Sequence, residues 1–477
     1  MNENPESLNA LSEMIALSSY GNTKNLIITA VDLGGPIDPA AMILATKRTG
    51  TTYPQFASTL KEIRQSAKHR LVWERHPDLE VPTIVTELKS SDAGGLLENF
   101  LLHLSPRLDR NWNLFEEVPA EVHLVRVSEN HYILAPVIHH AVADGGTASE
   151  FGRELLANYH EIITGERPHW ACEPHPLSST KKRMVEAKKA SLRDYIQEAR
   201  EAVTHAMEKP ILLKGEGTPG DTRQFHVKRL LSEEDSLRII GGSFKRGISP
   251  VDLFAACTNL AIDGWNGARD VPPGLLTTSV SVNMRGRFRG FEGGNTSGLI
   301  FFRSAPEDRR DLRTYARSIA VRRIRHFRNQ MDLTFFQNVS RMTGVLNLFP
   351  FKARQRAVHF LMNTHQFSAA VTFLGVIWPV FKNGKLSMES SPTEMGGISI
   401  DEVHGIGYKL LSNTRILLIA YIFRNRLNLM LAASASLFTR EEAESFTDLI
   451  LANLMQNALE AEAGEGQTRP AVGNGMA

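Results

Sequence analysis

Apolar and polar positions in the first third of the chain predict strands that alternate with helices. Residues 25–33 are β-branched and apolar, which is typical of a buried strand. Asp38-Pro39 then offers a helix cap followed by proline at the first helical position. Residues 121–127 and 131–138 predict two strands of a hairpin, because Ser-Glu-Asn between them is turn-forming.

The second half repeats this alternation of strands and helices. Hairpins place neighbouring strands antiparallel, whereas strand–helix–strand units favour parallel strands, so we expect α/β layers with mixed sheets. The elements predicted here are strands 224–231, 275–282 and 299–303, a helix from 250 to about 261, a long helix at about 308–328 with Ile324 toward the core, a hairpin of 415–423 and 427–434, and a last helix after Thr439.

The length of 477 residues favours two domains, or one fold built from two similar halves. The pattern weakens between the two sets of elements, where proline, glycine and basic runs predominate. We therefore predict an N-terminal half at 1–175, a crossover linker at 176–222, a C-terminal half at 223–460 and a disordered tail at 461–477.

Composition narrows the classes of function. Basic residues (54) and acidic residues (52) nearly balance, so the chain has no overall positive electrostatic field that would bind nucleic acid. Its two cysteines, Cys172 and Cys257, suit a reducing cytoplasm rather than a disulfide framework or a structural zinc site. The most apolar window, 416–423, is too short to span a bilayer. We expect a cytoplasmic monomer without integral membrane association.

The stretch IHHAVADGG, residues 138–146, carries the candidate chemistry. It lies between a predicted strand and a helix, for which Thr147 and Glu150 suggest a capping box. Imidazole is the side chain best suited to take a proton near neutral pH. Neighbouring residues that leave a strand point to opposite sides, so one of His139 and His140 would face a cavity and the other would make a structural hydrogen bond.

Two other readings of this stretch stay open. Either histidine could simply pack at the seam between the halves with its nitrogens satisfied. Asp144 could be a plain turn aspartate, although Gly145 and Gly146 allow a close approach that a Cβ would forbid. Opposite-facing histidines argue against a metal site built from His139, His140 and Asp144.

The segment His139-His140-Ala141-Val142-Ala143-Asp144-Gly145 resembles the HHxxxDG signature of thioester-dependent acyltransferases. This superfamily includes chloramphenicol acetyltransferase, peptide-synthetase condensation domains, wax ester synthases and polyketide-associated acyltransferases. The resemblance extends to VDLGGPIDPAAMILATKRTGTTYPQF upstream, to EFGRELLANYHEIITGERP downstream, and to SVNMRGRFRGFEGGNTSGL in the second half.

The resemblance implies a V-shaped pair of chloramphenicol-acetyltransferase-like α/β halves with the active site in a tunnel between them. His140 would be the general base, and Gly145 would let substrate approach the reacting centre. Asp144 would be a structural residue paired with an arginine, for which Arg285 in the Asn283-Met284-Arg285 stretch is the candidate. A solvated turn arginine is the alternative for Arg285.

The sequence also departs from the family pattern. No DFGWG follows the last strands, which argues against the plant-type branch, and Gly146 stands where many condensation domains carry Trp. The segment 371–375, VTFLG, replaces the Ser-Asn-x-Gly of relatives. Thr372 is thus a candidate donor to the oxyanion of a tetrahedral intermediate, or else an ordinary strand threonine.

A row of arginines on the long helix at about 308–328 allows two interpretations. The row is either a solvated helix face or a binding surface. As a binding surface it would contact an acidic carrier protein or the phosphates of coenzyme A. The arginines in question are Arg309, Arg313, Arg317, Arg322 and Arg325.

These observations predict an acyltransferase that moves an acyl group from coenzyme A or a phosphopantetheinyl carrier protein to an alcohol or amine. It would act as a standalone condensation-like enzyme in secondary-metabolite or lipid biosynthesis. It would need no metal and no permanently bound cofactor, and a carrier protein would dock in trans. The alternatives are a non-catalytic member that only docks carrier proteins, and an enzyme that cyclises or epimerises a tethered intermediate.

Overall fold

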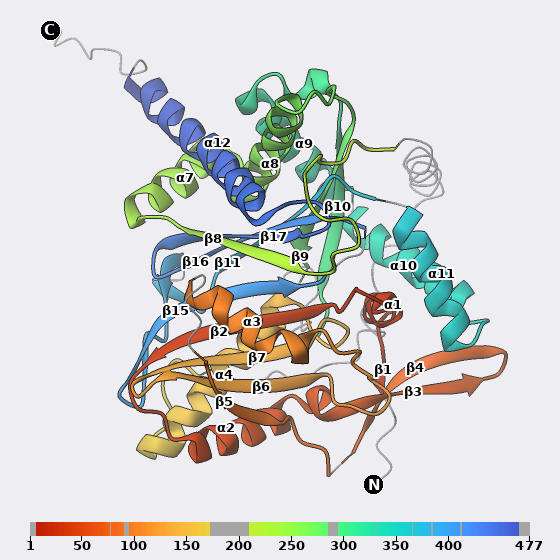
Figure 1. The fold of residues 1–477 in the computed structure, drawn as a ribbon, viewed down its shortest axis with the longest axis vertical. Coiled ribbons are helices and arrows are strands. Elements are labelled where there is room, and N and C mark those ends of the chain that lie inside the picture. Colours follow the sequence, from red (N-terminus) through yellow and green to blue (C-terminus); the bar gives the residue numbers. More distant parts are fainter. Residues whose placement is uncertain are drawn as a thin grey trace, which may run out of the picture.

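The computed structural model describes residues 6–76, 78–89, 95–171, 209–284, 294–329, 331–364, 366–382, 385–410 and 413–466. These residues form two α/β lobes, one above the other in Figure 1, each built on a six-stranded mixed sheet. The predicted fold class is confirmed.

The first sheet has the order β14-β15-β2-β7-β6-β5. Only β5 and β6 run parallel; the other neighbours are antiparallel, including the predicted hairpin β6–β7. Helices α2 and α4 pack together on this lobe. The elements are β2 (Leu26–Gly34), α2 (Pro39–Thr52), β5 (Thr83–Glu87), α3 (Leu96–Leu108), β6 (Ala120–Ser128), β7 (His131–His139), α4 (Gly145–Thr164), β14 (Glu394–Met395) and β15 (Ile398–Tyr408).

The second sheet has the order β10-β9-β11-β16-β17-β8, with β11 parallel to both of its neighbours. Helices α7, α8, α9 and α12 cover its outer side (Figure 1). The elements are β8 (Gln224–Leu230), α7 (Glu233–Lys245), α8 (Pro250–Gly267), β9 (Leu276–Asn283), β10 (Ser297–Ser304), η3 (Pro306–Arg309), α9 (Leu312–Arg328), β11 (Ala369–Val376), β16 (Ile416–Phe423), β17 (Arg426–Ser434) and α12 (Arg440–Gly466).

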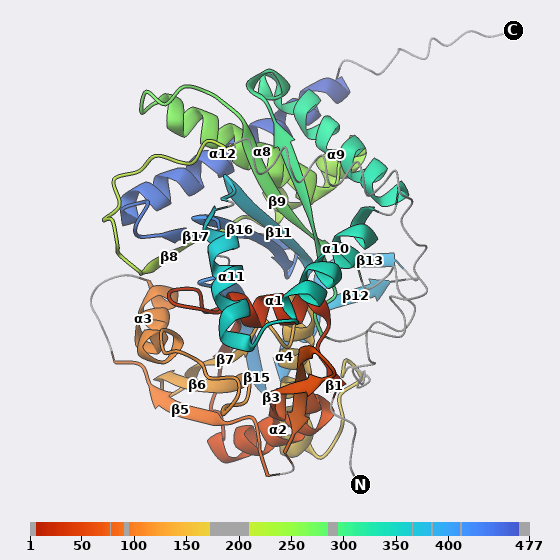
Figure 2. The same ribbon diagram turned by 90° about the vertical axis from the view of Figure 1, so that its right-hand side faces the viewer.

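Smaller elements complete the structure. Helices α10 and α11 both pack against α1, on the side that faces the viewer in Figure 2. The remaining elements are β1 (Glu6–Ser7), α1 (Ala10–Ser18), η1 (Pro54–Ala57), β3 (Ser58–Gln65), β4 (Lys68–Arg75), α10 (Met331–Leu346), α11 (Phe351–Thr364), β12 (Pro379–Lys382) and β13 (Lys385–Ser390).

Strand β16 is apolar throughout because it contributes side chains to the cores of both lobes. Its residues alternate between two hydrophobic cores, because successive side chains of a strand point to opposite faces. Leu417, Ile419, Tyr421 and Phe423 join the core of the first lobe, whereas Ile416, Leu418, Ala420 and Ile422 join that of the second. The continuous apolar run therefore reflects burial on both faces. No helix in the described ranges is long and apolar enough to cross a membrane.

The chain passes from the first lobe to the second before β8, returns to the first sheet for β14 and β15, and enters the second sheet again at β16. Residues 209–222, in the predicted linker, lie along the second lobe, where Ile211 N–H donates to Leu275 O at 2.8 Å. Later, β15 leaves the second half and pairs with β2 in the first sheet, an exchange that the sequence did not predict. Helix α12 extends to Gly466, into the predicted tail, and residues 467–477 lie outside the described ranges.

The arginine-rich helix α9 differs from its prediction. It begins at Leu312, because the Asp311 carboxylate caps it by accepting from Thr314 N–H at 2.7 Å. Arg309 does not face solvent, since it is buried and donates to Asp263 at 2.6 and 2.9 Å. Ile324, predicted for the core, is 41% exposed.

Candidate active site

The HHxxxDG motif forms the junction between β7 and α4. β7 ends at His139, and α4 begins at Gly145. Asp144 is the N-cap residue, and its Oδ1 accepts from Thr147 N–H at 3.0 Å. The predicted capping box at Thr147 and Glu150 is therefore wrong in register: the helix starts earlier, and the aspartate of the motif caps it.

The two histidines lie in different surroundings, as the alternation along a strand requires. His139 is buried, and its Nδ1 accepts from Ala141 N–H at 3.1 Å. Its ring also packs edge-on against Trp112. Burial, with His140 beside it, lowers the pKa of His139 to about 3, so this imidazole stays neutral and has a structural role.

His140 is half-buried and contacts the second lobe through Asn295. Its Nδ1 lies 3.0 Å from Asn295 Oδ1. Asn295 Nδ2 donates to His140 O at 2.6 Å and to Ser12 Oγ at 3.0 Å. Because a carbonyl can only accept, the amide nitrogen must face His140 O, and Oδ1 must face the imidazole.

This arrangement fixes the tautomer of His140. An amide oxygen only accepts, so Nδ1 of His140 carries the proton and Nε2 keeps its lone pair. Burial lowers the pKa of His140 below its usual 6.5, while its own carbonyl, Asp144 and Asn295 act in the opposite direction. The imidazole is thus neutral at physiological pH, with Nε2 available to accept a proton.

Residues of the N-terminal segment hydrogen-bond to both Asn295 and His140. Asn9, the N-cap residue of α1, donates through Nδ2 to Asn295 O at 3.2 Å. Asn25 adopts a left-handed backbone conformation (φ 51°), and its carbonyl accepts from His140 N–H at 2.7 Å. Sequence reasoning missed Asn295, although it lies in the GGN of the stretch that resembles the family; no local signal marks Asn9 or Asn25.

Asp144 joins the lobes through its second oxygen. Oδ2 accepts from Thr296 N–H at 2.9 Å, from Thr296 Oγ1 at 3.0 Å and from Ser297 Oγ at 3.2 Å. Thr147 Oγ1 donates to Gly294 O at 2.9 Å. The start of α4 is therefore held to the segment that also presents Asn295.

Gly145 lies against β11 of the second lobe. A Cβ built on it would come 3.0 Å from Leu374 Cδ2, closer than an ordinary carbon contact, so any side chain here would displace Leu374.

The supporting residues that the sequence suggested lie near this junction but are not joined to His140 by any contact described. Thr372 Oγ1 lies 2.9 Å from Ser281 Oγ on the neighbouring strand β9, and Thr372 precedes Leu374 by two residues on β11. Asn283 ends β9, where it is exposed and pairs in register with Ser297. Arg285 lies outside the described residues, so its pairing with Asp144 stays a prediction.

One cluster among the described residues has the spacing of metal ligands: Asp32, Glu402 and His404. Its position between the sheets favours another interpretation. The ammonium of Lys228 pairs with Glu402 and lies 3.0 Å from His404 Nδ1, while His404 Nε2 lies 3.2 Å from Asp32 Oδ2. A cation already occupies this cluster, so we interpret it as an ion-pair network between β8 and β15.

Solved structures similar to this chain include condensation domains, an epimerization domain and an O-acetyltransferase. The trichothecene 15-O-acetyltransferase of Fusarium sporotrichioides superposes with a TM-score of 0.69 at 12% identity, over 95% of this chain and 94% of that one. The epimerization domain of tyrocidine synthetase B gives 0.68 at 12% identity, over 97% and 98%. The starter condensation domain of rhizomide synthetase, in complex with C8-CoA and Leu-SNAC, gives 0.65 at 13% identity, over 96% and 95%.

Sequence comparison finds short matches within peptide synthetases, and no family model matches the chain. Cyclosporin synthetase of Tolypocladium inflatum is 34% identical over 86 residues, 18% of this chain. Enniatin synthase of Fusarium equiseti is 26% identical over 159 residues, 33% of this chain. These matches span 1% and 5% of the two synthetases. The chain thus has the fold of the superfamily of condensation domains and chloramphenicol-acetyltransferase-like enzymes.

Proposed function

We propose that this chain is an acyltransferase that moves an acyl group from a thioester to a hydroxyl or amine, with His140 as the general base. The observation that carries the proposal is the contact of Asn295 with His140, which places the proton of the neutral imidazole on Nδ1 and leaves Nε2 unprotonated. In the reaction, Nε2 takes the proton of the acceptor as its oxygen or nitrogen attacks the thioester carbonyl. The C–S bond then breaks, and the imidazolium returns the proton to the leaving thiolate.

Two proteins of similar structure support a thioester as the acyl donor and a hydroxyl or amine as the acceptor. One is a 15-O-acetyltransferase, and another was solved with C8-CoA and Leu-SNAC. We infer that the donor here is acyl-coenzyme A or a phosphopantetheine-linked acyl group, and that the protein acts in natural-product or lipid biosynthesis. The residues in the site require no metal: a positioned base and bound substrates suffice for acyl transfer.

The docking alternative predicts that carrier proteins bind without transfer. Because Asn295 holds His140 in the tautomer that a general base requires, we favour transfer over docking alone. Cyclisation or epimerisation of a tethered intermediate would use the same base; the likeness to an epimerization domain concerns the fold.

Single-turnover mass spectrometry tests the proposal directly. Wild type, His140→Ala and a control, His169→Ala, are each mixed with a panel of acyl-coenzyme A and acyl-carrier donors and a pool of alcohols and amines. His169 is exposed and lies beyond the end of α4, the helix that the motif begins. We expect wild type and His169→Ala to transfer an acyl group, and His140→Ala to be slower by about 10²–10⁴-fold.

Each other outcome has a defined meaning. Carrier binding without transfer by any of the three proteins would favour the docking alternative. A tethered substrate returned cyclised or with inverted configuration would favour the third reading. Full transfer by a folded His140→Ala variant would refute the role of His140.

A further inference from the structure

Two turns project together from one side of the molecule. The α10–α11 turn and the β3–β4 turn lie side by side, at the right in Figure 1, where His69 N–H donates to Asn347 O at 2.6 Å. Arg354 joins α11 to α1 and β3. Its side chain is fully buried, pairs with Glu13 of α1 and donates to Glu62 of β3 at 2.8 Å. The projection is therefore rigidly mounted.

The α10–α11 turn exposes large apolar side chains. Val345 is 62% exposed, Leu348 51% and Phe349 52%. Isolated exposed apolar residues are ordinary, but three within five positions of a projecting turn form a patch, and such patches mark interaction sites.

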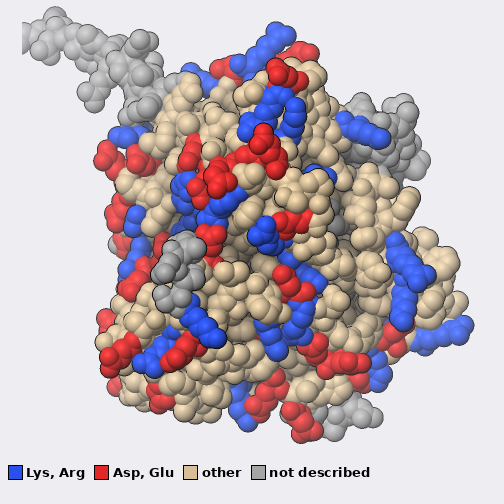
Figure 3. Space-filling model, viewed as in Figure 1, with Lys and Arg blue, Asp and Glu red and all other residues tan. Residues whose placement is uncertain are grey.

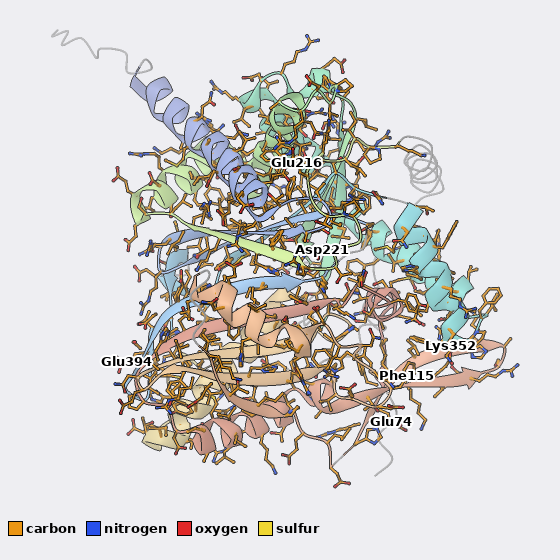
Figure 4. The ribbon with its side chains drawn as sticks, viewed as in Figure 1. Glu74, Phe115, Glu216, Asp221, Lys352 and Glu394 are labelled. Atoms are coloured by element: carbon orange, nitrogen blue, oxygen red, sulfur yellow. The ribbon has the colours of Figure 1, made fainter. Side chains whose placement is uncertain are left out.

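The charged side chains of the two turns are basic, whereas Glu62 and Glu74 lie farther along β3 and β4, where they pair with Arg354 and Lys61. Residues 333–364 and 63–73 contain no Asp or Glu. Arg64, Lys68, Lys352 and Arg356 are exposed there. Figure 4 labels Lys352 beside the β3–β4 hairpin, and Figure 3 shows Lys and Arg over this side of the molecule. In a chain whose net charge is only +2, this is a local concentration of positive charge.

We propose that the docking edge, formed by Arg64, Lys68, Val345, Leu348, Phe349 and Lys352, binds the surface of an anionic membrane. The apolar side chains would enter the headgroup region, and the basic residues would contact lipid phosphates. A projecting turn suits this occupant, because it can insert between headgroups without a complementary groove. The contact is peripheral and uses no membrane-spanning helix.

Vesicle co-sedimentation of the full chain tests this inference, and it does not depend on catalysis. The vesicles are phosphatidylcholine alone or with about one third phosphatidylglycerol. The variants are Leu348→Ser/Phe349→Ser and Lys68→Ser/Lys352→Ser, with circular dichroism to confirm folding. The matched control is Leu237→Ser/Phe244→Ser on α7, whose side chains are 54% and 64% exposed but lie outside the docking edge.

We expect wild type and the α7 control to sediment with the anionic vesicles and not with the neutral ones. Each docking-edge variant should bind at least about tenfold more weakly, and 0.5 M salt should weaken wild type. Wild type that stays in the supernatant, docking-edge variants that sediment like wild type, or an equal loss in the control would overturn the inference. Binding of an acidic carrier protein by this edge, without vesicle binding, would assign it to a protein partner instead.

Discussion

At the scale of single residues, one amide decides which nitrogen of His140 can act as a base. Asn295 donates to the His140 carbonyl and accepts from the His140 ring, so rotation of the amide would break both bonds. The sequence could predict the histidines, because the motif is local. It could not predict their partner, since His140 and Asn295 lie 155 positions apart.

The pH dependence of kcat/KM tests this pairing. If His140 is the general base, activity requires its neutral form, so kcat/KM should rise with pH through an apparent pKa below 6.5 and then level off. Asn295 stabilises the charged imidazole, so Asn295→Ala should shift the acid limb to lower pH and reduce kcat by about tenfold or more. Asn295→Asp adds a negative charge and should shift the limb to higher pH.

Asn130→Ala is the control for this pH profile, since Asn130 is exposed in the β6–β7 turn, at the opposite end of β7 from His139. Its acid limb should coincide with that of wild type. Identical limbs in all four proteins would show that Asn295 does not act on the base.

At the scale of elements, the start of α4 is held more firmly than an ordinary helix start. Asp144 caps the helix with one oxygen and binds Thr296 and Ser297 with the other. The sequence predicted a helix after the motif, but it misplaced the cap, because Thr147 and Glu150 fit a local capping pattern equally well. Only the contact with the other lobe distinguishes the two registers.

Replacement of Asp144 by Asn should therefore destabilise the protein. The amide offers one acceptor and places an N–H₂ group against donors, which leaves a buried backbone N–H unpaired and lowers the free energy of unfolding by about 1–3 kcal/mol. Asp38→Asn provides the control, because Asp38 caps α2 in an exposed position and Asn caps as well as Asp. Denaturant unfolding of both variants measures the difference; equal stabilities would contradict the dual role of Asp144.

At the scale of the whole molecule, the site exists only because the two lobes meet. His140 comes from the first lobe and Asn295 from the second, while β15 and the Lys228 network join the sheets. The alternation of strands and helices predicted the two mixed sheets, since it is a property of each segment. The passage of β15 into the first sheet was not predictable from local pattern, because β2 and β15 are far apart in the sequence.

A double-mutant cycle on single-turnover acyl transfer tests the central claim most directly. The proteins are wild type, His140→Ala, Asn295→Ala and the double variant. If Asn295 acts through His140, the double variant should be no slower than His140→Ala, to within about twofold. Losses that simply multiply, or a His140→Ala variant as fast as wild type, would contradict the assignment of His140 as the base that Asn295 orients.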